Sequence, residues 1–306
     1  MKDLKVLPAI LAMALVSLLP LRMAQALGKA LGRRVYRQGE RQKLYAVTRT
    51  NIDLCFPSLE GDAREALIRE SLEQTGCSIA EMGLSWFWSP ERVLSKVRSV
   101  EGEELIAQEL NAGRGILLIA PHLGNWEVMN LYLSQHYPVT AMYKPPKQKL
   151  LDKLILKRRA RLGSRMAPAD ARGVRMVIKA LRSGGLVGIL PDQEPERSGG
   201  VYAPFYGEPA LTMKLLPQLA AQTGVRVFCG YGKRLPDGAG FELRFSAADP
   251  AVGSKDQVAA AAAMNASIER CIDECPAQYQ WEYKRFNTRE DRSRGPYSRK
   301  NRERRD

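Results

Sequence analysis

The chain has 306 residues, of which 45 % are hydrophobic, so it can bury the core of one large domain or of two small ones. Its 47 lysines and arginines against 33 acidic residues give a formal net charge of +14, which favours anionic partners such as nucleic acid, acidic lipid head groups or an acidic carrier protein. The five cysteines are odd in number and follow no framework spacing, which argues against a disulfide scaffold and predicts reduced thiols in a cytosol-facing protein.

The N-terminal segment is apolar. Val6 to Leu21 carries no charge, but its sixteen residues fall short of the roughly 20 that a straight helix needs to span a bilayer. A cleavable signal peptide is one interpretation, because Ala24-Gln25-Ala26 has the form of a cleavage site, although Arg22 lies awkwardly before it. An ordinary buried helix is a second. We favour the third, a membrane anchor over residues 1–28 that either spans the bilayer or lies at its interface.

Helical patterns follow the apolar segment. Arg41 to Cys55 is expected to form a helix, and a second helix is expected to start at Asp62 as N-cap and run towards Gly76. The aromatic cluster at 85–88 fits core or interface packing better than a specific lipid contact. From residue 116 onward, strand-like and helix-like segments alternate.

The alternation predicts an α/β fold with a mostly parallel sheet flanked by helices. The expected strands are Ile116–Ala120, Val139–Tyr143, Leu186–Leu190, Val225–Tyr231 and Phe241–Phe245. The expected helices are Trp126–Gln135, Lys149–Leu162, Val174–Ser183, Leu211–Thr223 and Val258–Cys275. We therefore expect one catalytic domain over residues 29–288 and a basic, disordered tail over 289–306.

One of only two histidines, His122, directly follows the first of these strands, in the stretch APHLGNWEV. Ligands of open α/β sheets gather at the carboxyl ends of strands, so this position suits chemistry. On a regular helix, residues five apart diverge by about 140°, so His122 and Glu127 can meet only if the chain turns between them. Gly124 permits such a turn, and Asn125 is a good N-cap for a helix that begins at Trp126.

This arrangement suits acyl transfer to a hydroxyl. A neutral imidazole of His122 removes the hydroxyl proton as the oxygen attacks a thioester, and the carboxylate of Glu127 on the other ring nitrogen fixes the tautomer. No serine or cysteine nucleophile is needed, and the chain has no G-x-S-x-G elbow, P-loop or dinucleotide fingerprint. As a pattern alone, H-x-x-x-x-E is weak, and its value comes from the strand before it and the helix after it.

The stretch Pro121–Glu127 resembles the signature of the lipid A biosynthesis lauroyl/myristoyl acyltransferase family, within the lysophospholipid acyltransferase superfamily. Lys144 stands where that family more usually has arginine, and Pro191-Asp192-Gln193 differs from the Pro-Glu-Gly-Thr block of the glycerol-phosphate branch. Further blocks that match the family in order are Thr50–Pro57, Met142–Pro146, Ala180–Gly184, Leu190–Gln193, Gly200–Gly207 with Ala210 and Thr212, and Tyr279–Phe286.

The resemblance implies a glycerol-3-phosphate-acyltransferase-like fold and an enzyme at the cytoplasmic face of the bacterial inner membrane. It would transfer a fatty acyl chain from acyl carrier protein to a hydroxyl of a lipid A precursor, with His122 and Glu127 as the catalytic pair. No metal or cofactor is implied, since the acyl carrier protein thioester is itself the donor substrate. Alternatives are acylation of another glycolipid or lysophospholipid, or a non-enzymatic basic protein that binds membranes or nucleic acid. A non-enzymatic binding protein would leave the position of His122 unexplained. We therefore expect no nucleic-acid partner.

Several residues are candidates for substrate binding. Asp192 and Gln193 follow a strand and face the same rim as His122, where Asp192 serves either as a second carboxylate of the site or as a cap of the next turn. Arg161 is the preferred phosphate contact within the basic stretch from Lys144 to Arg165. The full set of substrate-binding candidates is Asn125, Tyr143, Lys144, Arg161, Asp192, Gln193 and Arg285.

Overall fold

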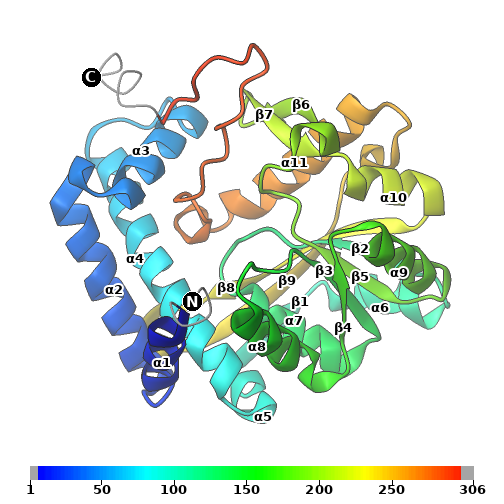
Figure 1. The fold of residues 1–306 in the computed structure, drawn as a ribbon, viewed down its shortest axis with the longest axis horizontal. Coiled ribbons are helices and arrows are strands. Elements are labelled where there is room, and N and C mark those ends of the chain that lie inside the picture. The colour runs from blue at the N-terminus through cyan, green and yellow to red at the C-terminus, as the bar shows by residue number, and fades with distance from the viewer. Residues whose placement is uncertain (1–5, 298–306) are drawn as a thin grey trace.

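Short apolar strands form the centre of the computed structural model, which describes residues 6–297 (Figure 1). Seven of them make one sheet in the order β1-β9-β8-β2-β5-β3-β4, in which only the β8–β9 pair is antiparallel. The strands of this sheet are β1 (Val97–Glu101), β2 (Ile116–Ile119), β3 (Val139–Tyr143), β4 (Arg165–Pro168), β5 (Leu186–Ile189), β8 (Arg226–Arg234) and β9 (Phe241–Ala247). The predicted mostly parallel sheet is therefore confirmed.

Helices cover both faces of this sheet. Because successive side chains of a strand point to opposite faces, Leu117 and Ile119 of β2 join one core, and Ile116 and Leu118 join the other. The first core is shared with α9 (Ala171–Arg182), α10 (Leu215–Thr223) and α11 (Gln257–Asp273). The second is shared with α5 (Pro90–Leu94), α6 (Glu103–Asn111) and α7 (Trp126–His136). A central strand buried on both faces explains why β2 reads as a continuous apolar run.

A group of N-terminal helices lies beside the sheet (Figure 1). It consists of α1 (Leu7–Val16), α2 (Leu21–Gln38), α3 (Lys43–Cys55) and α4 (Gly61–Phe87), while α8 (Lys149–Arg159) lies near α7. Glycines let α2 approach α4 closely: a Cβ on Gly28 would lie 2.5 Å from the carbonyl oxygen of Gly76, and one on Gly76 would lie 2.0 Å from that of Gly28. Any side chain at either position would force the two helices apart.

The structure does not support the membrane-spanning form of the predicted anchor in the part of it that is described. The apolar segment is divided, because α1 ends at Val16 and α2 begins at Leu21 directly after Pro20. Among residues 6–297, none of the helices combines the length and the apolar character that crossing a bilayer requires. Both helices pack against α4, and the indole of Trp88 donates to the carbonyl of Ser17 at 2.6 Å. Residues 1–5 of the predicted anchor lie outside the described part of the chain.

Two other expectations differ from the structure. The helix expected from Leu211 begins at Leu215, because residues up to Met213 form β7 (Glu208–Met213), which pairs with β6 (Gly200–Phe205) as an antiparallel ribbon. The helix expected to end near Gly76 continues to Phe87, so the aromatic cluster is its last turn. Both errors have the same cause: tertiary packing decided where a locally ambiguous apolar segment begins or ends.

The closing segment, residues 279–297, follows the short 3-10 helix η7 (Pro276–Gln278) and crosses back to α3. The amide of Asn51 on α3 donates to the carbonyls of Trp281 and Tyr283 at 2.6 and 2.7 Å, and the hydroxyl of buried Tyr297 donates to the Asn51 oxygen at 2.5 Å. Packing thus continues to Tyr297, past the predicted start of the tail at residue 289, and residues 298–306 lie outside the described part.

A buried ion pair joins the N-terminal helices to the sheet. Glu81 of α4 and Arg234 at the end of β8 are 1 % and 4 % exposed, and the guanidinium Nη2 donates to the carboxylate at 2.6 Å. The same carboxylate accepts from the side-chain amides of Gln25 at 2.7 Å and Asn125 at 3.0 Å. These hydrogen bonds satisfy the buried carboxylate of Glu81, and a folded protein tolerates a buried charge only when it is satisfied in this way.

Removing one partner of this pair should destabilise the fold strongly. We expect Glu81→Ala to lower the free energy of unfolding by about 3–5 kcal/mol, because Arg234 would stay buried without its counter-charge. The matched control is Glu73→Ala on the same helix, since Glu73 pairs with the half-exposed Arg33 and should lose at most about 1 kcal/mol. Urea unfolding of the two variants checks this, and equal losses would contradict a special role for the buried pair.

Candidate active site

His122 lies in a tight turn at the carboxyl end of β2. Gly124 takes φ +60°, and a Cβ there would lie 2.0 Å from the carbonyl oxygen of Gly232, so the position admits only glycine. The Asn125 side chain accepts from the backbone N–H of Val128 at 3.0 Å and caps α7, which begins at Trp126. The turn predicted between His122 and the helix is confirmed.

The His122 ring is held by Asp192, which follows β5, the strand next to β2. Nδ1 of His122 lies 2.8 Å from one carboxylate oxygen, and its backbone N–H donates to the other at 2.8 Å. Burial alone would raise the pKa of Asp192, but the charge and hydrogen bonds of His122 outweigh it and hold that pKa below its ordinary value. An ionised Asp192 accepts from Nδ1–H, so the lone pair of the neutral imidazole lies on Nε2.

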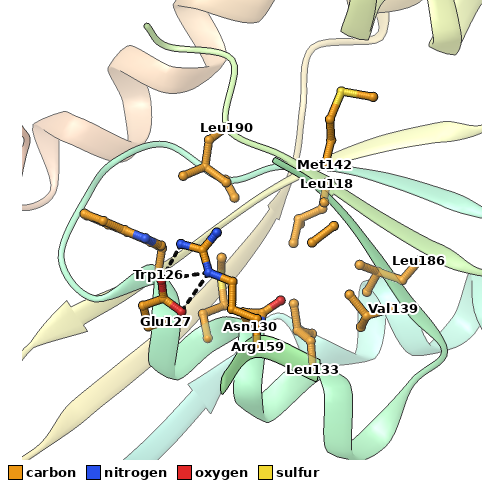
Figure 2. A pocket seen from close by; sticks show the side chains of 14 residues that line it. Leu118, Trp126, Glu127, Asn130, Leu133, Val139, Met142, Arg159, Leu186 and Leu190 are labelled. Carbon is orange, nitrogen blue, oxygen red and sulfur yellow. Dashed lines mark hydrogen bonds and ion pairs between the residues drawn. The ribbon is translucent and has the colours of Figure 1, made fainter. Parts of the chain in front are cut away.

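Glu127 does not make the contact that the spacing suggested. It lies in the first turn of α7, 6 % exposed, and its carboxylate accepts from Nε of Arg159 at 2.9 and 3.2 Å. Figure 2 shows the Arg159 guanidinium facing this carboxylate. The carboxylate expected on the second ring nitrogen of His122 is therefore supplied by Asp192, while Glu127 pairs with α8.

The other side of the His122 ring faces side chains from two later segments. Nε2 of His122 lies 3.4 Å from the amide nitrogen of Gln193, which also donates to the side-chain oxygen of Gln280 at 2.9 Å. The backbone N–H of Gln280 donates to the His122 carbonyl at 3.1 Å, and the Trp126 ring lies edge-on at 5.0 Å from the imidazole. The predicted neighbourhood of His122, Asp192 and Gln193 is confirmed, and Gln280 is an addition that sequence reasoning missed.

Two predicted substrate contacts have structural roles instead. The Asn125 amide donates to buried Glu81 while its oxygen caps α7, so both ends of the side chain bond to the protein. Arg285 is 2 % exposed and donates to the Leu211 carbonyl at 2.8 Å and to the Thr212 hydroxyl at 2.9 Å. The sequence predicts that Arg285 binds substrate, but the closing segment places its side chain in the core.

Of the remaining candidates, Arg161 is bound by the protein itself, while Tyr143 and Lys144 lie at the edge of the sheet that carries His122. Arg161, the expected phosphate contact, donates to the carbonyls of Arg158, Trp88 and Ser85, and burial lowers its pKa. Lys144 is exposed and Tyr143 is partly buried. Both lie at the carboxyl end of β3, next to β5 and thus on the same edge of the sheet as His122. Burial, followed by the charge of Asp152, raises the pKa of the Tyr143 hydroxyl.

An apolar pocket opens beside this site, between α7 and the sheet (Figure 2). It begins at Trp126 and the Glu127–Arg159 pair and continues down the strands, past Gly188, towards Leu186. A Cβ on Gly188 would meet no atom of residues 6–297 within 4 Å, so this position borders open space. The residues that line the pocket are Leu118, Ala120, Trp126, Glu127, Met129, Asn130, Leu133, Val139, Ala141, Met142, Arg159, Leu186, Gly188 and Leu190.

Comparison with known proteins agrees with this geometry. The family described as bacterial lipid A biosynthesis acyltransferase matches residues 6–288. A lipid A biosynthesis acyltransferase of Haemophilus influenzae is 32 % identical over 255 residues, which are 83 % of this chain and 80 % of that protein. The lipid A biosynthesis lauroyltransferase of Escherichia coli is 30 % identical over 276 residues, 90 % and 89 % of the two chains.

A third relative differs in the acyl group after which it is named. The lipid A biosynthesis palmitoleoyltransferase of Escherichia coli is 30 % identical over 245 residues, which are 80 % of this chain and 79 % of that protein. The family match over residues 6–288 includes the His122 turn, the Asp192 loop and the residues that line the pocket. The chain belongs to the bacterial lipid A biosynthesis acyltransferase family, and it is an acyltransferase.

Proposed function

We propose that this acyltransferase moves a fatty acyl chain from acyl carrier protein to a hydroxyl of a lipid A precursor. His122 is the general base, and Asp192 is the acid that orients it. One observation carries this proposal: Asp192 holds His122 through Nδ1, and the imidazole packs edge-on against Trp126, which lines an apolar pocket. The names of the relatives supply the lipid A precursor as acceptor.

The reaction needs one proton carrier. As the acceptor oxygen bonds to the thioester carbon, its proton passes to Nε2 of His122, and the ionised Asp192 stabilises the imidazolium. When the carbon–sulfur bond breaks, the imidazolium returns that proton to the departing thiolate. The products are the new ester and the free thiol of the carrier, and His122 is neutral again.

The apolar pocket supports a fatty acyl donor. Burial of each methylene contributes about 0.8 kcal/mol, so a long chain gains most of its binding free energy there. The pocket extends from Trp126 and Arg159 at one end to Val139 and Leu186, which pair across β3 and β5, at the other. Its depth sets the acyl length in this proposal, and relatives named for lauroyl and palmitoleoyl groups differ in that length.

Exposed lysines near the pocket entrance support an acidic carrier protein as donor. Helix α8, which contributes Arg159 to the pocket, and the loop before it carry a basic surface. Its exposed members are Lys144, Lys147, Lys149, Lys153 and Lys157. Such a surface steers an acidic partner towards the entrance, and the effect weakens as salt rises.

The N-terminal helices support attachment to the cytoplasmic face of the bacterial inner membrane without crossing it. Leu7, Leu11 and Leu15 recur every four residues along α1 and are 44 %, 56 % and 66 % exposed. On α2, Leu27 and Leu31 continue the pattern, and exposed arginines lie nearby. An apolar stripe beside cations is typical of a helix that lies in the interface of an anionic membrane.

The catalytic assignment makes an ordered prediction for three variants. We expect His122→Ala to abolish transfer from acyl carrier protein, and Asp192→Asn to lower kcat by about 10³–10⁴-fold because it removes the charge that orients the imidazole. Glu127→Gln should cost less, since it disturbs Arg159 at the pocket entrance and not the base. Steady-state kinetics with purified variants checks the order.

A reversed order, with Glu127→Gln more damaging than Asp192→Asn, would restore Glu127 as the partner of His122. Folding of each variant is confirmed by thermal melting. The acceptor is tested separately by mass spectrometry of lipid A from a strain that lacks the enzyme. A missing secondary acyl chain supports the lipid A precursor, and unchanged lipid A would point to another glycolipid.

The pocket makes a prediction about acyl length. Gly188→Ala, →Val and →Leu place increasing volume in its open middle, so the preferred donor should become shorter with each step. We expect the Leu variant to discriminate at least tenfold against the longest donor that the wild type accepts. The matched control is Gly253→Leu, because Gly253 is exposed and a Cβ there also meets no atom of residues 6–297 within 4 Å. An unchanged donor profile in the Gly188 series would show that the acyl chain binds elsewhere.

The apolar stripe makes a prediction about membrane binding. Leu11→Ser and Leu15→Ser should each weaken binding to anionic vesicles about tenfold or more, because burial of a leucine contributes about 1.5–3 kcal/mol. The control is Val258→Ser, at a position on α11 that is 50 % exposed and belongs to another part of the molecule. Vesicle flotation measures the difference, and equal binding by all three variants would exclude the stripe as the attachment surface.

A further inference from the structure

A row of hydrogen-bonded side chains lies on the open side of the His122 ring. The amide nitrogen of Gln193 is 3.4 Å from Nε2 of His122 and donates to the side-chain oxygen of Gln280 at 2.9 Å. The Gln280 side chain in turn lies beside the carboxyl of Glu282 and lowers its pKa, and this carboxyl accepts from the Thr75 hydroxyl of α4 at 2.9 Å. The row therefore runs from α4 to the neighbourhood of His122.

The direction of these hydrogen bonds follows from the carboxylate at the far end. The Gln280 oxygen accepts from Gln193, so the NH₂ group of Gln280 is the end that is free to face the carboxyl oxygens of Glu282. Gln193 must then turn its own NH₂ group towards Gln280 and His122. Glu282 thereby determines the orientation of two amides, one of which lies next to the base.

The Glu282 carboxyl is largely buried, and hydrogen-bond donors surround it. Burial raises the pKa of Glu282, and its own backbone N–H, the Thr75 hydroxyl and the Gln280 amide oppose that rise by donating to it. Glu282 is therefore an acceptor at the end of the row, next to Gln280.

The contact between Gln193 and His122 is not itself a strong hydrogen bond. A distance of 3.4 Å exceeds the usual 2.7–3.2 Å, and the lone pair of Nε2 is needed for the proton of the acceptor. One N–H of Gln193 is used by Gln280, and the second faces the space where the base works. A fixed donor at that place suits the negative charge that develops when a hydroxyl attacks a thioester.

We propose that Gln193 is a catalytic residue whose amide N–H stabilises the oxyanion of the tetrahedral intermediate, and that Gln280 and Glu282 are positioning residues that hold this amide. The inference rests on the proposed acyl transfer. As the acceptor oxygen bonds to the thioester carbon, its proton goes to Nε2 and the carbonyl electron pair moves onto oxygen, which accepts from Gln193. When the C=O bond re-forms, the C–S bond breaks and the imidazolium protonates the sulfur.

The catalytic part is tested with Gln193→Met, which keeps the length of the side chain and removes its N–H donors. We expect kcat to fall about 10²–10³-fold, with KM for the acyl donor changed no more than about threefold. The acidic limb of the pH profile of kcat/KM should stay in place, because His122 and Asp192 are untouched. The control is Gln222→Met, at an exposed position on α10, which should match the wild type.

The positioning part is tested by combining variants. Glu282→Gln removes the fixed acceptor, so both amides can flip and kcat should fall about tenfold in the wild-type background. In the Gln193→Met background the same substitution should have no further effect, because Glu282 acts only through Gln193. Additive losses would overturn the positioning role, and thermal melting shows whether each variant is folded.

The outcomes separate the two proposals. A wild-type protein that transfers nothing from acyl carrier protein to the lipid A precursor overturns the proposed function, and the oxyanion role with it. An active wild type with a full-rate Gln193→Met variant overturns the oxyanion role alone. An active wild type, a slow Gln193→Met variant and an unshifted acidic limb support both.

Discussion

The buried ion pair of Glu81 and Arg234 is the constraint on which the site depends. Two charges taken out of water cost several kcal/mol each unless every lone pair and proton is satisfied. Here a single carboxylate accepts from Arg234 of β8, Gln25 of α2 and Asn125 of the His122 turn. The requirement to satisfy one charge therefore holds the N-terminal helices, the sheet and the turn that carries the base in a fixed relation. The N-terminal helices are part of the catalytic unit for this reason.

Two carboxylates near the base have different tasks because of where their backbones place them. Asp192 follows a strand adjacent to β2, so it reaches both the ring and the backbone of His122. Glu127 lies in the first turn of α7, where its side chain points to α8 and neutralises Arg159 beside an apolar pocket. Asp192 therefore orients His122, while Glu127, at the start of α7, holds Arg159 beside the pocket.

Local patterns predicted the strands β2, β3 and β5 closely and placed His122 in a turn made by Gly124 and Asn125. They did not identify the partner of His122, because Asp192 is seventy positions away and sheet order cannot be read from one chain. The short strands β1 and β4 carry polar residues and little alternation, so periodicity missed them. The leucines of α1 look alike whether a helix crosses a bilayer or lies on one, so the sequence left both forms of the anchor open.

The closing segment has a consequence for how the enzyme comes into being. Ribosomes deliver the sheet with His122 and Asp192 well before residues 279–297, and domains fold as their chain emerges. Gln280 and Glu282 are synthesised after the sheet, and the segment that carries them is held by hydrogen bonds from Asn51 of α3. A nascent chain therefore holds its base before it holds the groups that surround it. Until the closing segment docks on Asn51, the side of the His122 ring that Gln193 and Gln280 cover in the folded protein lacks Gln280.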